Sequence, residues 1–310
     1  MEKFEPRKLP TVLTAEELID KAFRRASKIS ERNKKKRYIN KLNTIHNVTS
    51  NHFQKIISSH PSYDNLPDFY RELVDVTVGL GKLKKALASL KWADESVQKV
   101  INKSVKDIKQ GKDIDSVLKS SYGRVSSLVN QIDPQLRYLN ETRNLLRKIP
   151  TFNESPTLVV AGYPNVGKSS LVAKISTVKP EVATYPFTTK EIFVGLRSLN
   201  GEKIQIIDTP GLLDRPFDQR NNIEKRAILC LKYLANCILF IIDPTETCGY
   251  TWEAQNSLLK EVSSSFKIPI IPIYSKADMH QYRDKPSFSI FTEEGLDEIV
   301  NIFMKELKEE

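Results

Sequence analysis

The first half of the chain carries apolar residues at the spacing of amphipathic α-helices. Residues 14–17 have the signature of a capping box, which satisfies free N–H groups at a helix start. Leucine, valine and isoleucine then recur every three or four positions over residues 80–108. Asp133 and Pro134 are typical of an N-cap followed by proline at the first helical position. Strand signals are nearly absent, so we predict an all-α domain of antiparallel helices over residues 1–150.

The second half alternates short apolar runs with helical segments. The runs that have the length of a buried strand are residues 157–161, 192–197, 203–207, 237–242 and 268–274. Asn200 and Gly201 predict a hairpin between the second and third runs. Pro272 is unexpected, because an interior strand that contains proline lacks one hydrogen-bond donor. The alternation favours an α/β domain with a doubly wound, mostly parallel sheet over residues 151–310.

The net charge of the chain is concentrated in its first half. Residues 1–150 contain 30 Lys and Arg against 17 Asp and Glu, a balance of +13, whereas the remainder has a balance of −3. This asymmetry predicts that the helical half faces an anionic partner, and a lysine-rich solvated surface is the alternative. The densest basic stretch consists of Arg24, Arg25, Lys28, Arg32, Lys34, Lys35, Lys36 and Arg37. We predict that this stretch contacts RNA; a solvated helix end and a localisation signal are the alternatives.

The composition argues against several other classes of protein. The three cysteines form no CxxC pair, and the four histidines form no cluster, so a protein metal centre of the zinc type is not expected. The N-terminus lacks the apolar segment of a secretory leader, and no apolar run is long enough to span a bilayer. We therefore expect a cytoplasmic monomer without membrane contact.

Residues 162–169 fit the phosphate-binding pattern Gly-x-x-x-x-Gly-Lys-Ser/Thr, directly after the first predicted strand. In this motif the lysine, here Lys168, reaches the β- and γ-phosphates, and the hydroxyl of Ser169 ligates Mg²⁺. An ordinary glycine turn between strand and helix is the alternative. We assign nucleotide binding to Gly162, Tyr163, Pro164, Asn165, Val166, Gly167, Lys168, Ser169 and Ser170.

Two further motifs occur in the order that a P-loop GTPase requires. Asp208 begins an Asp-Thr-Pro-Gly segment after an apolar run; its carboxylate would hold Mg²⁺ through water, and the N–H of Gly211 would sense the γ-phosphate. Thr188 and Thr189 lie between the two motifs, and we favour Thr189 as the residue that closes over Mg²⁺ and the γ-phosphate. The predicted catalytic set is Lys168, Thr189 and Gly211, and the predicted magnesium ligands are Ser169, Thr189 and Asp208.

The base-binding motifs are less complete. Residues 275–278, Ser-Lys-Ala-Asp, stand where guanine-specific proteins have Asn-Lys-x-Asp, with Ser275 in place of asparagine and Lys276 at the lysine position. The carboxylate of Asp278 would accept two hydrogen bonds from guanine; adenine would forfeit them at about 1.5–3 kcal/mol each. Ser289 and Ile290 match the loop whose backbone N–H meets guanine O6. We expect the helix between these motifs to be short or missing, and the next helix to open at residues 292–294.

Four segments together resemble one family of GTPases. They read GYPNVGKSSLV, YPFTTK, IIDTPGLLDRP and ETCGYTWEAQ, and the N-terminal segment PTVLTAEELIDKAFRRASK is similar as well. The chain is identified by them as a member of the nucleolar GTP-binding protein 1 family, within the Obg-related P-loop GTPases. The resemblance covers essentially all 310 residues. Because the chain ends at Glu310, it resembles a compact, archaeal-type member.

The resemblance implies a factor that binds GTP and GDP and acts on rRNA in the assembly of the large ribosomal subunit. Leu212 stands where Ras-like enzymes carry the water-positioning glutamine, so slow hydrolysis is expected. Asn165 matches an asparagine that in related GTPases helps to hold a potassium ion; bracing of the loop is the alternative. A nucleotide-sensing, rRNA-binding module with negligible hydrolysis, or an ATPase of the same fold, are the alternative functions.

Overall fold

The computed structural model describes residues 5–149, 152, 155–184, 191–199, 202–209, 213–282 and 284–309. Proximity of the backbone divides the chain into two compact units, one of residues 1–66 and 78–147 and one of residues 67–77 and 148–310. This division places residues 67–77 with the second unit, whereas the sequence predicts a helical domain over residues 1–150. The helix α3 (Asp68–Val78) contributes its Phe69 and Tyr70 to the second unit: the Phe69 ring packs edge-on against Phe152, and the Tyr70 hydroxyl accepts a hydrogen bond of 2.7 Å from the Phe152 N–H.

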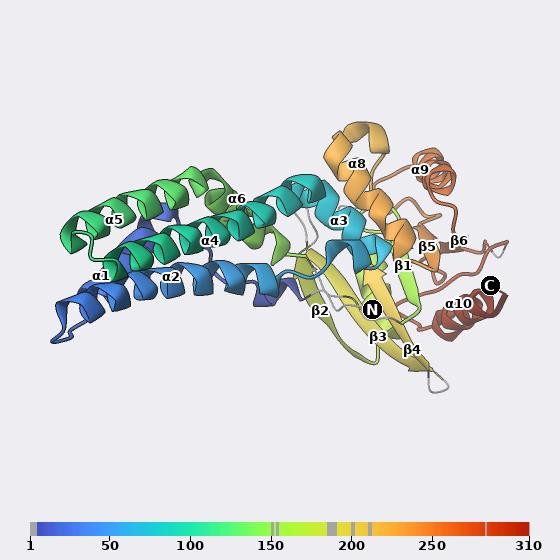
Figure 1. Ribbon diagram of the computed structural model, residues 1–310. Helices are drawn as coiled ribbons and strands as arrows, with labels where there is room; N and C mark the ends of the chain where they lie inside the picture. Colours follow the sequence, from blue (N-terminus) through green and yellow to red (C-terminus); the bar gives the residue numbers. More distant parts are fainter. Residues whose placement is uncertain are drawn as a thin grey trace. The chain divides into compact units, whose positions relative to one another are not determined.

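The first unit consists of helices that lie side by side (Figure 1). They are α1 (Ala15–Ser27), α2 (Lys34–Ser59), α4 (Leu80–Lys109), α5 (Ile114–Gln131) and α6 (Asp133–Leu146). Their aliphatic stripes form the core, in which Leu18, Leu42, Leu83 and Leu90 are fully buried. The capping box at Thr14 and Glu17 is confirmed. This unit therefore derives its stability from the apolar faces that the helical periodicity predicts.

The start of α6 differs slightly from the prediction. The helix begins at Asp133, and Ile132 takes the cap position. The carboxylate of Asp133 accepts hydrogen bonds from the N–H of Ala15 (2.8 Å) and from Arg137 (2.6 Å). Asp133 thus joins the starts of α1 and α6 instead of capping its own helix.

The second unit is built around a six-stranded sheet of order β2-β3-β4-β1-β5-β6. Its strands are β1 (Thr157–Ala161), β2 (Val178–Thr184), β3 (Glu191–Leu199), β4 (Glu202–Asp208), β5 (Cys237–Ile242) and β6 (Ile270–Tyr274). Neighbours are parallel from β4 to β6, whereas β3 runs antiparallel to β2 and β4. The predicted mostly parallel sheet is confirmed. Leu199 pairs with Glu202, as a hairpin requires, and its turn residues lie outside the described chain.

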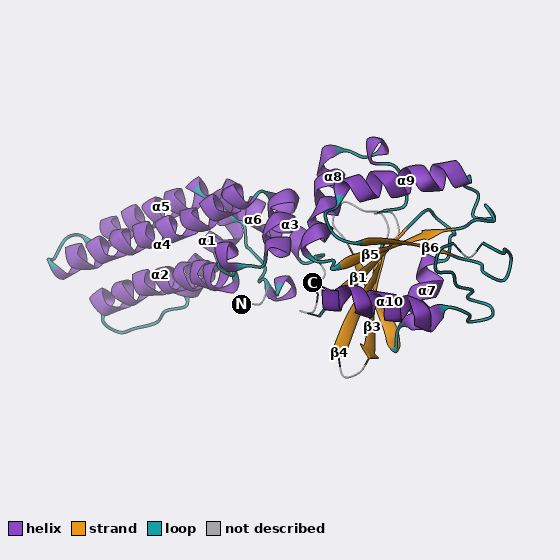
Figure 2. Ribbon diagram, turned by 90° about the vertical axis from the view of Figure 1, so that its right-hand side faces the viewer, coloured by secondary structure: helices purple, strands orange, loops and turns teal. Residues whose placement is uncertain are grey.

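Helices cover both faces of this sheet. Figure 2 shows α7 (Lys168–Ile175) and α10 (Leu296–Glu309) on one face, and α8 (Asn222–Leu229) and α9 (Trp252–Ser265) on the other. The parallel strands β1, β4, β5 and β6 end at the same edge of the sheet, so the loops that follow them come together there. This edge is where doubly wound proteins bind their ligands. No helix in the described part of the chain has the length and apolarity needed to cross a membrane.

Two details at β6 and α10 correct the predicted pattern. Pro272 pairs in register with Phe240, and β6 is the last strand of the sheet, so the proline lies in an edge strand and not in an interior one. α10 begins at Leu296, later than predicted, because Glu293 and Gly295 have φ angles of 62° and 77° that are incompatible with a helix.

Candidate functional site

The loop between β1 and α7 has the backbone that wraps a phosphate. Gly162 has a φ of 131°, and a Cβ atom on it would lie 2.5 Å from the carbonyl oxygen of Ile241, so only glycine fits. Gly167, with a φ of 103°, directly precedes the first residue of α7. Asn165 adopts a φ of 64° and is exposed, a conformation that asparagine tolerates better than most residues. The amide groups of this helix start are thereby directed at the loop interior, where an anion binds favourably.

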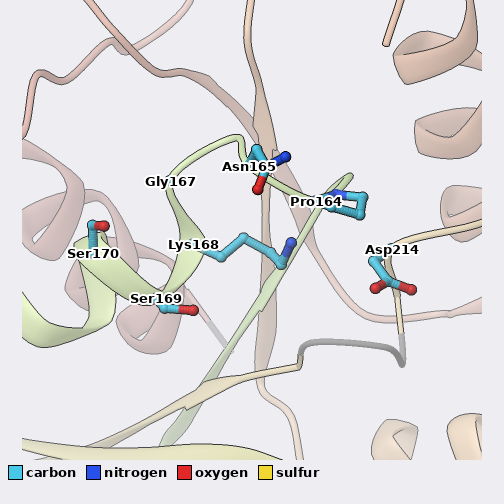
Figure 3. A pocket seen from close by; sticks show the side chains of 7 residues that line it. All are labelled: Pro164, Asn165, Gly167, Lys168, Ser169, Ser170 and Asp214. Atoms are coloured by element: carbon cyan, nitrogen blue, oxygen red, sulfur yellow. The ribbon is translucent and has the colours of Figure 1, made fainter. Parts of the chain in front are cut away.

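A hollow of about 420 Å³ lies against this loop (Figure 3). Its lining residues are Pro164, Asn165, Gly167, Lys168, Ser169, Ser170 and Asp214. The Lys168 side chain is almost fully buried, and its Nζ donates a hydrogen bond of 2.7 Å to the carbonyl oxygen of Tyr163. The hollow therefore combines a buried ammonium group with helix-start amides, which is the chemistry of a polyphosphate site.

Ser169, which lines the hollow, and its hydrogen-bond partner Asp208 together offer oxygen atoms that fit a divalent cation. The Ser169 hydroxyl donates a hydrogen bond to Oδ2 of Asp208, which is completely buried at the end of β4. The Oδ1 atom of Asp208 has no hydrogen-bond partner within the described chain. Burial raises the pKa of this carboxyl group, although the hydrogen bond from Ser169 and the charge of Lys168 oppose the shift. A buried carboxylate oxygen without a partner beside a hydroxyl is a pair of hard ligands suited to Mg²⁺.

Asp214 is a residue of the hollow that sequence reasoning missed. It is nearly fully buried and forms an ion pair of 3.4 Å with the equally buried Arg220. The segment is fastened to the phosphate loop, because the Gly162 N–H donates to the carbonyl oxygen of Leu213 (3.0 Å). The Asp-Arg-Pro sequence at 214–216 was the available signal, but it gave no role for the carboxylate.

The predicted base-binding loop begins directly after β6 at the same edge of the sheet. The N–H of Ser275 donates to Ile242 (2.9 Å), and the N–H of Ala277 donates to Phe288 (3.0 Å). These two bonds place the loop between β5 and the segment that carries Ser289. The Asp278 side chain is exposed. Its carboxylate has no ion-pair partner in the described chain, so it is accessible to a base.

The Ser289–Ile290 segment is brought to this loop, but with a difference from the prediction. The N–H of Ser289 donates to the carbonyl oxygen of Glu294 (3.1 Å), and its hydroxyl accepts from the N–H groups of Phe291 and Thr292. The amide of Ser289 is therefore engaged within the chain, which leaves the adjacent Ile290 as the member of the pair to meet a base. As expected, no helix occurs in the described residues between Asp278 and Ser289.

The loops around the site concentrate unusual backbone conformations. The non-glycine residues of the described chain with positive φ are Asn165, Glu246, Lys276 and Glu293. All of them lie in loops that follow β1, β5 or β6. Such conformations cost about 1 kcal/mol or more, and they are typical of functional loops whose surroundings hold them. Thr189, Gly211 and Leu212, which we assigned to Mg²⁺, the γ-phosphate and the water position, lie outside the described residues.

The basic stretch of the first unit divides into two groups. Around Arg24, Arg25 and Lys28, a second hollow of about 420 Å³ is completed by Leu13, Glu17 and Lys21. Arg24 also pairs with Asp20. At the start of α2, in contrast, the basic residues bind to neighbours: Lys34 pairs with Asp115 (2.9 Å), Lys35 donates to the carbonyl oxygen of Lys109 (3.0 Å), and Lys36 pairs with Glu31 (3.6 Å). The structure thus gathers the α1 residues around one hollow and engages the Lys34–Lys36 side chains in structural contacts.

Comparison with known proteins gives matches over both units. The family described as NOG1 N-terminal helical domain matches residues 6–153, and the family described as Nucleolar GTP-binding protein 1 matches residues 222–278. Residues 156–248 also match the family described as Ferrous iron transport protein B.

Individual relatives agree with these matches. An uncharacterized protein of Methanocaldococcus jannaschii is 43% identical over 286 residues, 88% of this chain and 81% of that protein. A probable nucleolar GTP-binding protein 1 of Dictyostelium discoideum is 35% identical over 75% of this chain, which spans 35% of that protein. A crystal structure of a Plasmodium falciparum nucleolar GTP-binding protein 1 is 34% identical with a TM-score of 0.46, covering 52% of this chain and 91% of that chain. The chain belongs to the nucleolar GTP-binding protein 1 family of P-loop GTPases.

Proposed function

We propose that the protein binds GTP and GDP with Mg²⁺ and hydrolyses GTP slowly as a switch in large ribosomal subunit assembly. The observation that carries the nucleotide part is the buried Asp208 carboxylate, whose Oδ1 lacks a partner beside the Ser169 hydroxyl and the Lys168 ammonium. Lys168 would neutralise the β- and γ-phosphates, and Ser169, Asp208 and Thr189 would hold Mg²⁺, which stabilises charge that develops during phosphoryl transfer.

Guanine is the base that the second half of the site favours. The exposed carboxylate of Asp278 can accept hydrogen bonds from the N1 and N2 groups of guanine, whereas adenine offers an acceptor at N1 and would oppose the carboxylate. Ser275 and the engaged amide of Ser289 depart from the complete guanine-binding motifs, and they are the observations that favour an ATPase of the same fold.

The rate of hydrolysis is proposed to be slow without an activator. Leu212 has no group that could orient water, which removes a contribution that glutamine makes in Ras-like enzymes. Asn165 is exposed at the mouth of the phosphate loop in a left-handed conformation, where its amide oxygen is available to a potassium ion. Such an ion would supply positive charge at the position where other GTPases use an arginine finger.

The ribosomal role is supported by the family and by the charge of the helical unit. The relatives named nucleolar GTP-binding protein 1 cover most of this chain, and residues 1–150 carry a net charge of +13. Electrostatic contact with rRNA phosphates would bring the GTPase unit to the large subunit or its precursor and would depend strongly on salt. We propose that the protein acts as a monomer.

The decisive experiment measures single-turnover GTP hydrolysis with and without purified large ribosomal subunits, in potassium and in sodium buffers. We expect a slow rate that large subunits increase and that potassium increases further. Equal rates in the two salts would reject the potassium assignment, and no hydrolysis with subunits present would support a nucleotide sensor. Competition by ATP as effective as that by GTP would reject guanine specificity.

A further inference from the structure

A buried carboxylate occupies the start of the β5–α9 loop, which we define as Asp243–Thr251. The Asp243 side chain is completely buried and accepts hydrogen bonds from the Lys276 Nζ (2.6 Å), the Cys248 N–H (2.8 Å) and the Thr247 hydroxyl (3.1 Å). Both the N–H (3.0 Å) and the hydroxyl (2.5 Å) of Thr245 also donate to it. Burial alone would raise the pKa of Asp243, but the bonds from Lys276, Thr245 and Cys248 outweigh it and lower the pKa, so the group is ionised at neutral pH.

The loop is fixed to the following helix by a second buried residue. Gln255 of α9 accepts a hydrogen bond from the Asp243 N–H (2.7 Å) and donates to the carbonyl oxygens of Asp243 and Tyr250 (3.0 Å each). The side chain of Gln255 thus satisfies the polar backbone at both ends of the loop. These contacts are all made within the chain, so the polar groups at both ends of the loop are satisfied without a ligand.

The β5–α9 loop contacts both ends of the nucleotide site. At the phosphate end, the ring of Tyr250 stacks on that of Tyr163 with centroids 4.1 Å apart. At the base end, Asp243 and Thr247 both bind the ammonium group of Lys276, the lysine of the base-binding loop. The loop therefore sets the position of Lys276 relative to the phosphate loop.

The backbone of Lys276 needs support from nearby side chains, and the neighbouring Ser275 gives only part of it. Lys276 has a φ of 60°, a conformation that is unfavourable for a residue with a side chain. Ser275 contributes one hydroxyl, which donates to the carbonyl oxygen of Ile242 at 3.3 Å, where an asparagine amide would offer both donors and an acceptor. The Asp243–Lys276 ion pair is well shielded, with side-chain exposures of 0% and 23%, so it restrains the lysine more strongly than a surface pair would.

We infer that Asp243 is a positioning residue of the nucleotide site, which holds Lys276 and the base-binding loop in the conformation that accepts a purine base. It takes over the bracing that Ser275 cannot supply. This inference rests on the proposed nucleotide-binding function and adds Asp243 to the residues that serve it. The simpler alternative is that Asp243 only stabilises its own loop.

The test compares two carboxylate-to-amide substitutions in the same loop of the full-length protein. Asp243→Asn keeps the size of the side chain but removes the charge that binds Lys276. Its NH2 group also faces N–H and O–H donors of the loop in either orientation, an effect on loop stability that the urea midpoint reports. Glu246→Gln is the matched control: Glu246 is exposed, accepts a hydrogen bond from the Trp252 N–H (2.6 Å) through an oxygen that glutamine retains, and makes no contact with Lys276.

Affinity for a fluorescent GTP analogue and the urea midpoint are measured for each protein. We expect Asp243→Asn to lower affinity by on the order of tenfold, as loss of one charge-assisted hydrogen bond would, and Glu246→Gln to stay within about twofold of the wild-type protein, because its hydrogen bond is kept.

A double-variant cycle separates positioning from loop stability. Lys276→Met and the double variant with Asp243→Asn are measured in the same way. If Asp243 acts through Lys276, the double variant loses no more affinity than the larger single effect. The inference would be overturned if the affinity losses of the two single variants multiplied in the double variant. It would also be overturned if the Asp243→Asn protein unfolded at lower urea but bound the nucleotide as well as the wild type. Failure of the wild-type protein to bind any guanine nucleotide would instead reject the proposed function itself.

Discussion

Asp208 combines two opposing physical demands in one side chain. Its complete burial and the unpartnered Oδ1 atom disfavour the charged form, whereas a magnesium ion requires that form. A binding residue of this kind lowers the stability of the nucleotide-free protein and recovers the difference when its ligand arrives.

This conflict predicts opposite effects of Asp208→Asn on stability and on binding. The amide removes a buried charge and should raise the free energy of unfolding of the nucleotide-free protein by about 1 kcal/mol. It should also weaken Mg²⁺-dependent nucleotide binding by on the order of a hundredfold, because a neutral ligand holds the cation poorly. Urea unfolding without nucleotide and calorimetric titration with and without Mg²⁺ measure the two effects. Lower stability of the variant would show that the carboxylate is not strained in the free protein.

At the scale of single residues, the sequence identifies side chains that belong to a local motif and misses those that do not. Lys168, Ser169 and Asp208 were predicted because each lies in a short segment with a known spacing. Asp243 was not, because its partner Lys276 is 33 positions away in sequence and only the pairing of β5 with β6 brings them together. Asp214 is also not predicted, because its place in the hollow depends on the fold of a loop and not on a motif with a known spacing.

At the scale of elements, His52 of α2 joins this helix to the segment just before α1 and makes that contact sensitive to acid. The Leu13 N–H donates to Nε2 of His52 (3.2 Å), so the ring must be neutral at that atom. Burial, with the charges of Lys21 and Lys55, lowers the pKa of His52 to about 4. Protonation would break the hydrogen bond and place a third positive charge beside the two lysines.

The helical unit should therefore lose stability between pH 6.5 and pH 4. In this range the unfolded chain binds protons at His52 and at His60, whose pKa burial also lowers to about 4, and the folded chain does not. The free energy of unfolding therefore falls as the pH drops, by about 3 kcal/mol from His52 over the full window. His52→Gln can still accept from Leu13 and should make this slope shallower. The fluorescence of Trp92 in a Trp252→Phe background follows the helical unit during urea unfolding. His280→Gln is the control, and an equal change of slope in both variants would contradict the assignment.

Most elements could be predicted from the sequence, and the exceptions have physical causes. Each of the five apolar runs corresponds to a strand. In β1 and β5 every residue is buried, and burial on both faces produces their continuous apolar sequence. Strand β2 was missed, since Lys179, Pro180 and Glu181 interrupt it and an edge strand needs no such run. Residues 67–77 were assigned to the helical half because helical periodicity does not reveal which core a helix joins.

At the scale of the whole molecule, the charge asymmetry predicts how RNA affinity depends on salt. We expect replacement of Lys21, Arg24, Arg25 and Lys28 by glutamine to reduce the slope of log affinity against log salt by about 0.7 for each phosphate of single-stranded RNA that the variant no longer neutralises. Replacement of Lys34, Lys35, Lys36 and Arg37 should change this slope less and lower stability more, because Lys34–Lys36 already bind groups of the protein. Filter binding to rRNA fragments at several salt concentrations, together with thermal unfolding, tests this. A larger slope change in the second variant would locate the RNA-binding surface on α2.

The edge position of Pro272 has a consequence for the behaviour of the protein in crowded solution. An exposed edge strand is a template on which another chain can add a strand, and this route leads to aggregation. Here both edges carry proline, Pro180 in β2 and Pro272 in β6, and the pairing of β2 with β3 is irregular between Val178 and Glu181. The outer side of β6 is further occupied at Tyr274, which forms a bridge to Ser287. Both margins of the sheet therefore discourage intermolecular strand addition.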